Sequence, residues 1–272
     1  MACGLGAAMM WPAPVPRNGV MIFRHVALAA ALAALALARP PAPLTVSAAV
    51  SLTDSLEAIA QAYSASGGGP VRFNFAGSNV LARQIVSGAP VDLFISADQA
   101  QMSLAIAAGA VDAASRVELL GNRLAIITRP GGPEIGDARA LLQPAVRRIA
   151  IGDPVAVPAG VYSRQYLQAA GLWDALQPKI VPVSNVRAAL AAVENGSADA
   201  GLVYETDAVS AGTSHTALVV SGPSAPRIVY PAAIVTSSRN RAAAERFLAF
   251  LRGSEAAAIF RKYGFLLLAA NG

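Results

Sequence analysis

The chain has 272 residues, of which 55% are hydrophobic and only 14% are charged. This length and apolar content allow one large or two modest domains with a well-packed core. The formal net charge of +5 comes from scattered basic residues, and no basic stripe with interleaved aromatic residues indicates a nucleic-acid-binding surface. We therefore expect no nucleic-acid partner.

The beginning of the sequence has the pattern of a secretory signal. From Met21 it reads "MIFRHVALAAALAALALARPPAP", with a basic start, an apolar run over 26–38 and a final Ala-Leu-Ala. The run is too short to span a bilayer comfortably. We expect translation to start at Met21 and residues 1–38 to be leader and cleaved signal peptide. The mature chain would begin near Arg39, in the periplasm, without stable membrane insertion.

Cysteine and histidine are almost absent from the expected mature chain. The only cysteine is Cys3, inside the leader, and His215 is the one histidine beyond it. This composition excludes disulfides, thiolate metal sites and a cysteine nucleophile, together with most hydrolytic triads and most zinc or iron sites. His215 lies in a segment rich in Gly, Ser and Thr, where a surface loop is expected.

Strand and helix patterns alternate along the first half of the mature chain. Strands are expected over 44–50, 71–75 and 91–96, and helices over 52–64, 79–86 and 99–107. Such alternation predicts an α/β fold with a mainly parallel sheet flanked by helices.

A second block follows with its own alternation. Strands are expected over 122–130, 147–154, 179–183, 198–204 and 227–238, and helices over 160–173, 186–196 and, broken at Gly253, 241–265. Gly171 and Gly196 have the position of helix C-caps, and a loop is expected after Tyr204. The strands near 123–128 and 229–235 flank the middle block. This arrangement predicts two lobes, 39–122 plus 232–272 and 123–231, joined by two crossover strands.

Ser51 lies at a junction between a buried strand and a helix. Asp54 follows three residues later, which resembles a capping box. Taken alone, this junction is either a helix cap or a binding site for a small anion, because helix N-termini present free N–H groups and a positive dipole end.

The junction recurs three times. A helix begins at Ser78 after Gly77, another near Pro158-Ala159-Gly160, and a third at Val186 after Ser184, which is a suitable N-cap. Ligands of open parallel sheets bind beyond the carboxyl ends of the strands, so the four helix starts can converge on one cleft. No lysine lies in the junctions, and Arg187 is expected to point away. Neutral donors without acceptors favour a fully deprotonated oxyanion.

Five segments resemble the periplasmic molybdate-binding proteins of ABC transporters, in order and over essentially the whole mature chain. They are "AAVSLTDSL", "FAGSNVLARQIVSGAPVDLFISAD", "GDPVAVPAGVYSRQYL", "SNVRAALAAVENGSADAGLVYETDA" and "IFRKYGF". The resemblance implies the two-lobe, type II periplasmic binding protein fold. It also implies an oxyanion, molybdate or tungstate, bound between the lobes and delivered to the membrane permease of an ABC importer by a monomeric receptor.

The resemblance also implies which residues bind the oxyanion. Ser51 and Ser78 would each donate a hydroxyl and a backbone N–H, Ala159 and Val186 a backbone N–H, and Tyr204 its phenolic O–H. No residue would contact molybdenum directly, and no cofactor is expected. The family is often serine-rich before the second serine, whereas here Asn79 follows Ser78 and is expected to add or rearrange a contact. Asp153 and Asp207 are expected to form a turn and a cap, since a carboxylate would repel a dianion.

Three other functions share features with this sequence. A receptor for another tetrahedral oxyanion such as sulfate would use the same scaffold, with cavity size as the difference. A transferase that handles phosphate would need a general base, a nucleophile or a metal, which the junctions do not offer. We therefore expect that the protein is not an enzyme. A ligand-sensing regulatory domain would carry a DNA-binding helix pair in place of the signal peptide.

Overall fold

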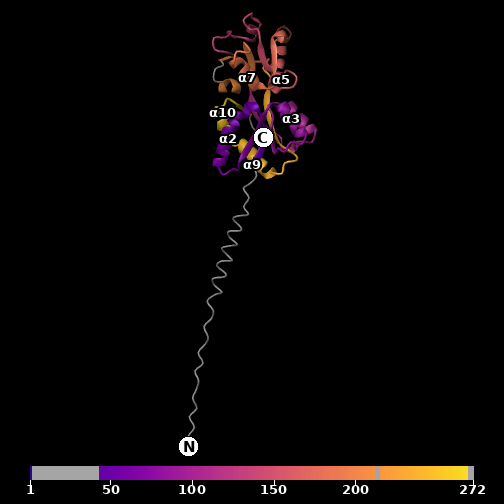
Figure 1. The fold of residues 1–272 in the computed structure, drawn as a ribbon, viewed down its shortest axis with the longest axis vertical. Helices are drawn as coiled ribbons and strands as arrows, with labels where there is room; N and C mark the ends of the chain where they lie inside the picture. The colour runs from indigo at the N-terminus through magenta and orange to yellow at the C-terminus, as the bar shows by residue number, and fades with distance from the viewer. Residues whose placement is uncertain (2–42, 212–214, 269–272) are drawn as a thin grey trace. The chain divides into compact units, whose positions relative to one another are not determined.

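The computed structural model describes Met1 and residues 43–211 and 215–268. The expected leader and signal peptide, apart from Met1, lie outside the described residues. The described elements form two sheets flanked by helices, one of six strands and one of five (Figure 1). In residues 43–211 and 215–268, no helix has both the length and the apolar run that crossing a bilayer requires.

The first sheet contains both ends of the described chain. Its order is β11-β4-β10-β3-β1-β2. Its strands are β1 (Leu44–Ala49), β2 (Val71–Ala76), β3 (Leu93–Ile95), β4 (Val117–Asn122), β10 (Ile228–Ile234) and β11 (Leu266–Leu267). Its neighbours along the chain are η1 (Val50–Leu52), α2 (Thr53–Ala65), α3 (Ser78–Val86), α4 (Gln99–Ala107), η2 (Ala113–Ser115), α9 (Arg241–Leu251) and α10 (Ser254–Lys262).

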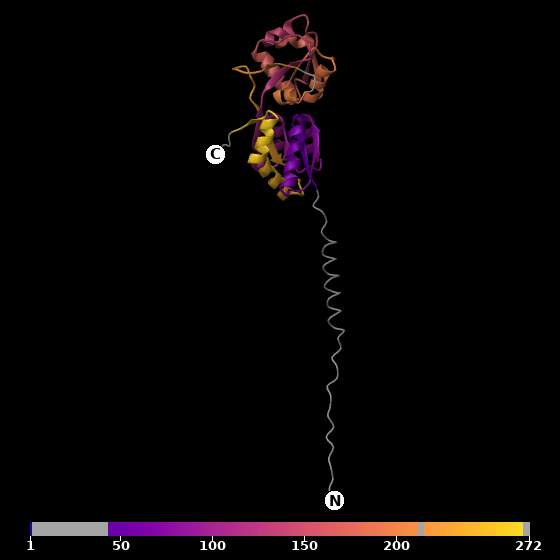
Figure 2. The same ribbon diagram turned by 90° about the vertical axis from the view of Figure 1, so that its left-hand side faces the viewer.

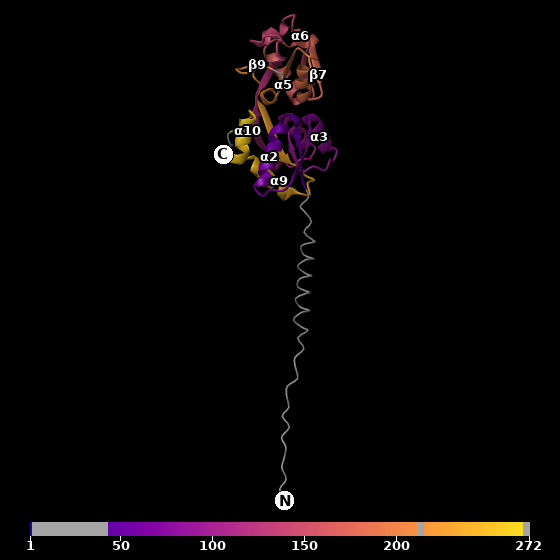
Figure 3. The same ribbon diagram turned by 60° about the vertical axis from the view of Figure 1, so that its left-hand side comes forward.

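The second sheet is built from the middle of the chain, in the order β7-β6-β8-β5-β9. Its strands are β5 (Leu124–Thr128), β6 (Ile149–Gly152), β7 (Ile180–Val183), β8 (Ala200–Tyr204) and β9 (His215–Val219). Its helices are η3 (Ala138–Leu142), α5 (Pro158–Ala169), α6 (Trp173–Leu176), η4 (Gln177–Lys179), α7 (Val186–Glu194) and α8 (Glu205–Ser210). Figures 2 and 3 show these middle segments grouped apart from α2, α9 and α10.

Both sheets are mixed, so the expectation of mainly parallel sheets is wrong. β1 is parallel to β2 and β3, and β6 is parallel to β7 and β8. In contrast, β10 is antiparallel to β3 and β4, and β5 is antiparallel to β8 and β9. The antiparallel strands flank the two crossings between the sheets: β4 leads through Arg123 into β5, and the chain returns between β9 and β10. A strand that arrives from the other sheet needs no crossover helix, so its direction is not restricted to parallel.

The expected helices are present, and Gly171 and Gly196 follow α5 and α7 with φ of +68° and +75°, as C-caps require. Three expectations differ from the structure. Strand β4 lies where no strand is expected, helix α8 follows Tyr204 where a loop is expected, and His215 begins strand β9 instead of lying in a loop. β9 forms because β5, far away in the sequence, offers its edge to it.

Glycine allows the first turn of α5 to pack closely against the end of β6. A Cβ atom at Gly160 would collide with the carbonyl group of Gly152 at the end of β6. Every other residue type would push α5 away from the strand, because the obstacle is backbone that cannot rotate aside. The amide of Ala159, the neighbour of Gly160, is thereby held at the carboxyl end of the second sheet.

Candidate functional site

A small pocket lies at the carboxyl ends of the parallel strands, between elements of the two sheets. Its lining consists of Ala49, Val50, Ser51, Ala76, Gly77, Ser78, Ala97, Val157, Pro158, Ala159, Asn185, Val186 and Tyr204. The set includes all five residues that the sequence singled out, from positions 51 to 204. The cavity volume is about 10 Å³, whereas pockets for organic ligands usually measure about 300–1,000 Å³. This space is too small for an organic ligand and holds about one water-sized group.

Ser51 lies inside η1, at the end of β1, and is buried. No side chain caps either η1 or α2, so the expected capping box of Ser51 and Asp54 is wrong. The Oγ of Ser51 lies 3.1 Å from the Oη of Tyr230. Because Ser51 does not cap its own helix, its Oγ does not accept a hydrogen bond from a helix N–H.

Ser78 is the first residue of α3, after the N-cap residue Gly77. Its Oγ accepts a hydrogen bond of 2.9 Å from the backbone N–H of Ala97, which leaves the hydroxyl proton available. A Cβ at Gly77 would lie 2.7 Å from Asn79 Oδ1 and 3.3 Å from the carbonyl oxygen of Ser184. Glycine therefore permits the close approach between this turn and the loop before α7. Asn79 is buried outside the pocket lining, and its Oδ1 has no hydrogen-bond partner among the described residues.

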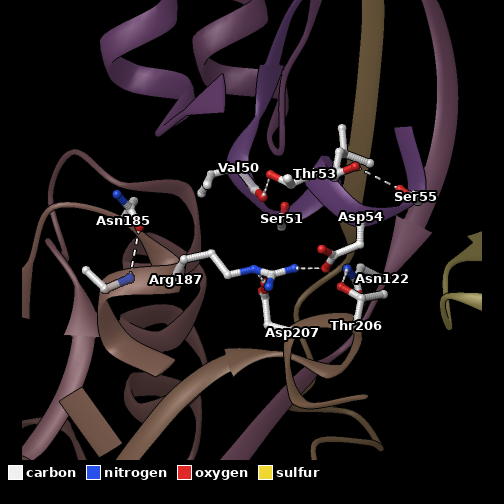
Figure 4. Close-up of polar contacts among 12 residues, drawn as sticks. Val50, Ser51, Thr53, Asp54, Ser55, Asn122, Asn185, Arg187, Thr206 and Asp207 are labelled. Carbon is white, nitrogen blue, oxygen red and sulfur yellow. Dashed lines mark hydrogen bonds and ion pairs between the residues drawn. The ribbon is translucent and has the colours of Figure 1, made fainter. Parts of the chain in front are cut away.

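Ala159 and Val186 contribute backbone groups at two helix starts. Ala159 is the second residue of α5, after Pro158, and Val186 is the first residue of α7. Amides at these positions have no acceptor within their own helix, and the positive end of the helix dipole lies behind them. The cap of α7 is Asn185, whose Oδ1 accepts from Ala188 N at 2.9 Å (Figure 4), and not Ser184 as expected.

Tyr204 ends β8 and is only 1% exposed. Its ring packs edge-on against Tyr230, with 5.7 Å between the ring centroids, and its Oη has no hydrogen-bond partner among the described residues. Burial, with smaller contributions from Tyr230, Tyr162 and two aspartates, raises the pKa of Tyr204 well above its ordinary value of 10. The phenol therefore keeps its proton and faces the pocket as a hydrogen-bond donor.

Within the described chain, no charged side chain lines the pocket. Arg187 points away from it, as expected, and its Nη2 lies 2.6 Å from Asp54 Oδ2, while its Nε lies 2.7 Å from Asp207 Oδ1 (Figure 4). Asp207 is therefore a buried ion-pair partner, and its expected capping role is wrong. Asp153 accepts from the backbone N–H groups of Val155 and Ala156, which confirms its expected role in a turn.

Sequence reasoning missed the polar residues behind the pocket. Tyr230 on β10, Asn122 on β4 and Thr206 on α8 are buried and joined by hydrogen bonds. Their positions are distant in the sequence, and each lies in or beside an apolar strand, where a polar side chain alone carries no signal of a partner. Only the pairing of β10 with β4 brings Tyr230 and Asn122 together.

The assembled pocket offers hydroxyl and amide donors, and the described lining has no side chain that serves as a general base at neutral pH. Three helix starts and η1 direct N–H groups at one small space. Such an arrangement is suited to hold an anion by hydrogen bonds and helix dipoles.

Comparison with known proteins agrees with this arrangement. The chain is 40% identical over 256 residues to a protein of Escherichia coli (strain K12) named molybdate-binding protein ModA, with 92% of this chain and 99% of the relative covered. Among solved structures, the Azotobacter vinelandii periplasmic molybdate-binding protein matches with a TM-score of 0.75 and 28% identity, covering 83% of this chain and all of that one.

A third relative shares the fold alone. The sulfate-binding protein SubI of Mycobacterium tuberculosis H37Rv matches with a TM-score of 0.73 at 21% identity, over 84% of this chain and 88% of that one. Residues 44–266 match the protein family described as "Bacterial extracellular solute-binding protein". The chain belongs to this family of bacterial extracellular solute-binding proteins.

Proposed function

We propose that this protein is an extracytoplasmic receptor that binds molybdate, and also tungstate, and delivers it to the membrane permease of an ABC importer. The relatives that carry the name molybdate-binding protein support this ligand, with 40% identity over nearly the whole chain. The pocket supports it independently, because its neutral donors suit a fully deprotonated oxyanion. The anion would be a transported ligand and not a cofactor.

The observation that carries the proposal is the hydroxyl of Tyr204. It is buried, protonated and without a hydrogen-bond partner in the part of the chain that the structure describes, in a pocket that Ser51, Ser78, Ala159 and Val186 also line. An unsatisfied buried hydroxyl costs about 1–3 kcal/mol. An anion in the pocket would accept this proton and remove the cost. The five residues would then donate as expected: hydroxyls and amides from the two serines, amides from Ala159 and Val186, and the phenol from Tyr204.

The mechanism would be binding by closure, without catalysis. We propose that the lobes follow the two sheets, so that the first crossing lies at residues 122–123 and the second lies ahead of Ile228, earlier than the expected boundary at 231/232. Ser51 and Ser78 would form one half-site, and Ala159, Val186 and Tyr204 the other. The anion would draw the half-sites together and expel water. The receptor would be exported through the signal at residues 1–38 and act in the periplasm as a monomer.

Calorimetric titration of the purified exported protein, stripped of ligand, tests this function. Molybdate, tungstate, sulfate and phosphate are titrated separately at pH 7. We expect tight one-to-one binding of molybdate and tungstate and no heat with sulfate or phosphate. Binding of sulfate alone would contradict molybdate as the ligand and leave the helix-terminus argument intact. Absence of binding to all four anions would contradict the receptor function.

A further inference from the structure

A buried chain of hydrogen bonds runs from the first crossing between the sheets to the pocket. Asn122 Nδ2 donates to Thr206 Oγ1 at 3.0 Å and to Tyr230 Oη at 3.2 Å. Tyr230 Oη lies 3.1 Å from Ser51 Oγ, and Ser51 lines the pocket. All four side chains are at least 95% buried, so water does not compete for these bonds. The protein groups alone therefore determine which atom donates and which accepts in each bond.

The direction at Asn122 is set by the backbone. Its Oδ1 accepts a hydrogen bond of 2.8 Å from the N–H of Arg123. If the amide were flipped, its NH₂ group would face this N–H, and two donors would oppose each other. The Nδ2 atom therefore faces Thr206 and Tyr230, and its two protons serve those two oxygens. Asn122 can only donate to Tyr230.

The direction at Tyr230 follows from that at Asn122. The Oη of Tyr230 accepts from Asn122, and among the described residues its other hydrogen-bond partner is Ser51 Oγ. If Ser51 donated to Tyr230, the phenolic proton would have no acceptor in a fully buried site, which carries the cost of an unmade hydrogen bond. The phenol therefore donates to Ser51, and the Ser51 hydroxyl proton has no acceptor among the described residues.

We propose that Tyr230 and Asn122 are positioning residues: the phenol of Tyr230 occupies a lone pair of the Ser51 hydroxyl, so that Ser51 directs its proton toward the pocket as a donor. This inference rests on the proposed oxyanion-binding function. Ser78 is held in the same state by a backbone group, because its Oγ accepts from Ala97 N. Both hydroxyls then present protons to the ligand. A fully deprotonated oxyanion satisfies them, whereas an anion that retains an O–H, such as hydrogen phosphate, meets donors where it needs an acceptor.

A double-mutant cycle on the purified exported protein tests the proposal. The variants are Ser51→Ala, Tyr230→Phe and the double variant, and the dissociation constants for molybdate and for hydrogen phosphate are measured at pH 7 by calorimetry. Tyr230→Phe removes one oxygen and keeps the ring that packs against Tyr204 and Phe265. Tyr63→Phe is the matched control, since Tyr63 is also a buried aromatic residue of the core and lies outside the pocket lining.

We expect Tyr230→Phe to raise the dissociation constant for molybdate about tenfold, the usual effect of one well-placed hydrogen bond. We also expect it to lower the ratio of molybdate to hydrogen phosphate affinity. In the Ser51→Ala background, Tyr230→Phe should change the molybdate constant less than twofold, because its effect passes through the Ser51 hydroxyl. Tyr63→Phe should change neither constant. Asn122→Ala should also weaken molybdate binding in the wild type and should lose this effect in the Ser51→Ala background, where the hydroxyl is missing.

The inference would be overturned if Tyr230→Phe raised the molybdate dissociation constant by the same factor in the wild-type and the Ser51→Ala backgrounds. It would also be overturned if the single variant left both the molybdate dissociation constant and the ratio of molybdate to hydrogen phosphate affinity unchanged. In either case tight binding of molybdate by the wild type would leave the proposed function standing. If the wild type bound none of the anions, both the function and the inference would be overturned. Thermal unfolding without ligand verifies that each variant is folded before it is titrated.

Discussion

Asp54 on α2 and Arg187 on α7 form an ion pair with 2.6 Å between Oδ2 and Nη2, and this pair joins a helix beside the first sheet to a helix beside the second. Arg187 is also 2.7 Å from Asp207, which is buried in the second group of elements. Neither Asp54 nor Arg187 lines the pocket, although Arg187 directly follows the lining residue Val186. The ion pair can therefore stabilise the contact between the two groups of elements without contact to the ligand.

Replacement of Asp54 by Asn should weaken molybdate binding about two- to fivefold, mainly through faster dissociation. The side chains of Arg187 and Asp54 are 26% and 41% exposed, so solvent screening limits what the pair contributes. Stopped-flow release and calorimetry measure the effect. The control is Asp112→Asn, which removes an ion pair with Arg241 between two elements beside the first sheet. An equal loss of affinity in both variants would contradict a role of this ion pair between the two sheets.

Ser51→Ala and Ser78→Ala should each weaken molybdate binding by about 1–3 kcal/mol, because each removes a charge-assisted hydrogen bond to the anion. Calorimetric titration of both variants measures this loss. Ser55→Ala is a suitable control, since Ser55 is also buried but donates to the carbonyl oxygen of Leu52, the N-cap residue of its own helix. Unchanged affinity in both pocket variants would refute the assignment of the site.

Tyr204→Phe should separate ligand affinity from stability. Its Oη has no hydrogen-bond partner among the described residues, so its removal should leave the free energy of unfolding unchanged or raise it by about 1–2 kcal/mol. The molybdate dissociation constant should rise about tenfold at the same time. Urea denaturation without ligand and calorimetry with ligand provide the two measurements. A variant that lost stability and kept its affinity would show that the hydroxyl serves the fold.

Asp207 should make the protein's stability depend on pH in an unusual direction. Burial raises the pKa of Asp207 to about 6, although Arg187 opposes the shift. Because this pKa lies above the ordinary value of 3.8, the folded state binds the proton more tightly than the unfolded state. The contribution of Asp207 is therefore full below about pH 4 and is lost as the pH rises through 6.

Urea denaturation at several pH values from 4.5 to 7.5 tests this expectation in the wild type and in Asp207→Asn. The difference in the free energy of unfolding between the two proteins should favour the wild type more at pH 4.5 than at pH 7.5. All other carboxylates titrate equally in both proteins and cancel in this difference. A constant difference across the range would show that Asp207 does not titrate there.

Much of the fold could be predicted because local patterns determine it. The helices 53–65 and 241–251 follow from apolar spacing, and the end of α7 follows from Gly196, whose positive φ suits glycine. The positions Ser51, Ser78, Ala159 and Val186 could be proposed because strand-to-helix junctions can be recognised over a few residues. The mixed strand directions could not be predicted, because β10 pairs with β3 and β4 only after the chain has crossed twice between the sheets.

What the sequence by itself determined is therefore the set of helix starts, the neutral character of their donors and the family resemblance. The tertiary structure alone decided the state of each hydroxyl. Ser51 has the sequence context of a cap, yet Tyr230, 179 positions away, takes the place of the helix as its partner. Arg187 and Asp54 likewise meet across 133 positions. Hydrogen bonds and ion pairs act over about 3 Å in space and are independent of separation along the chain, so such partners become visible only after folding.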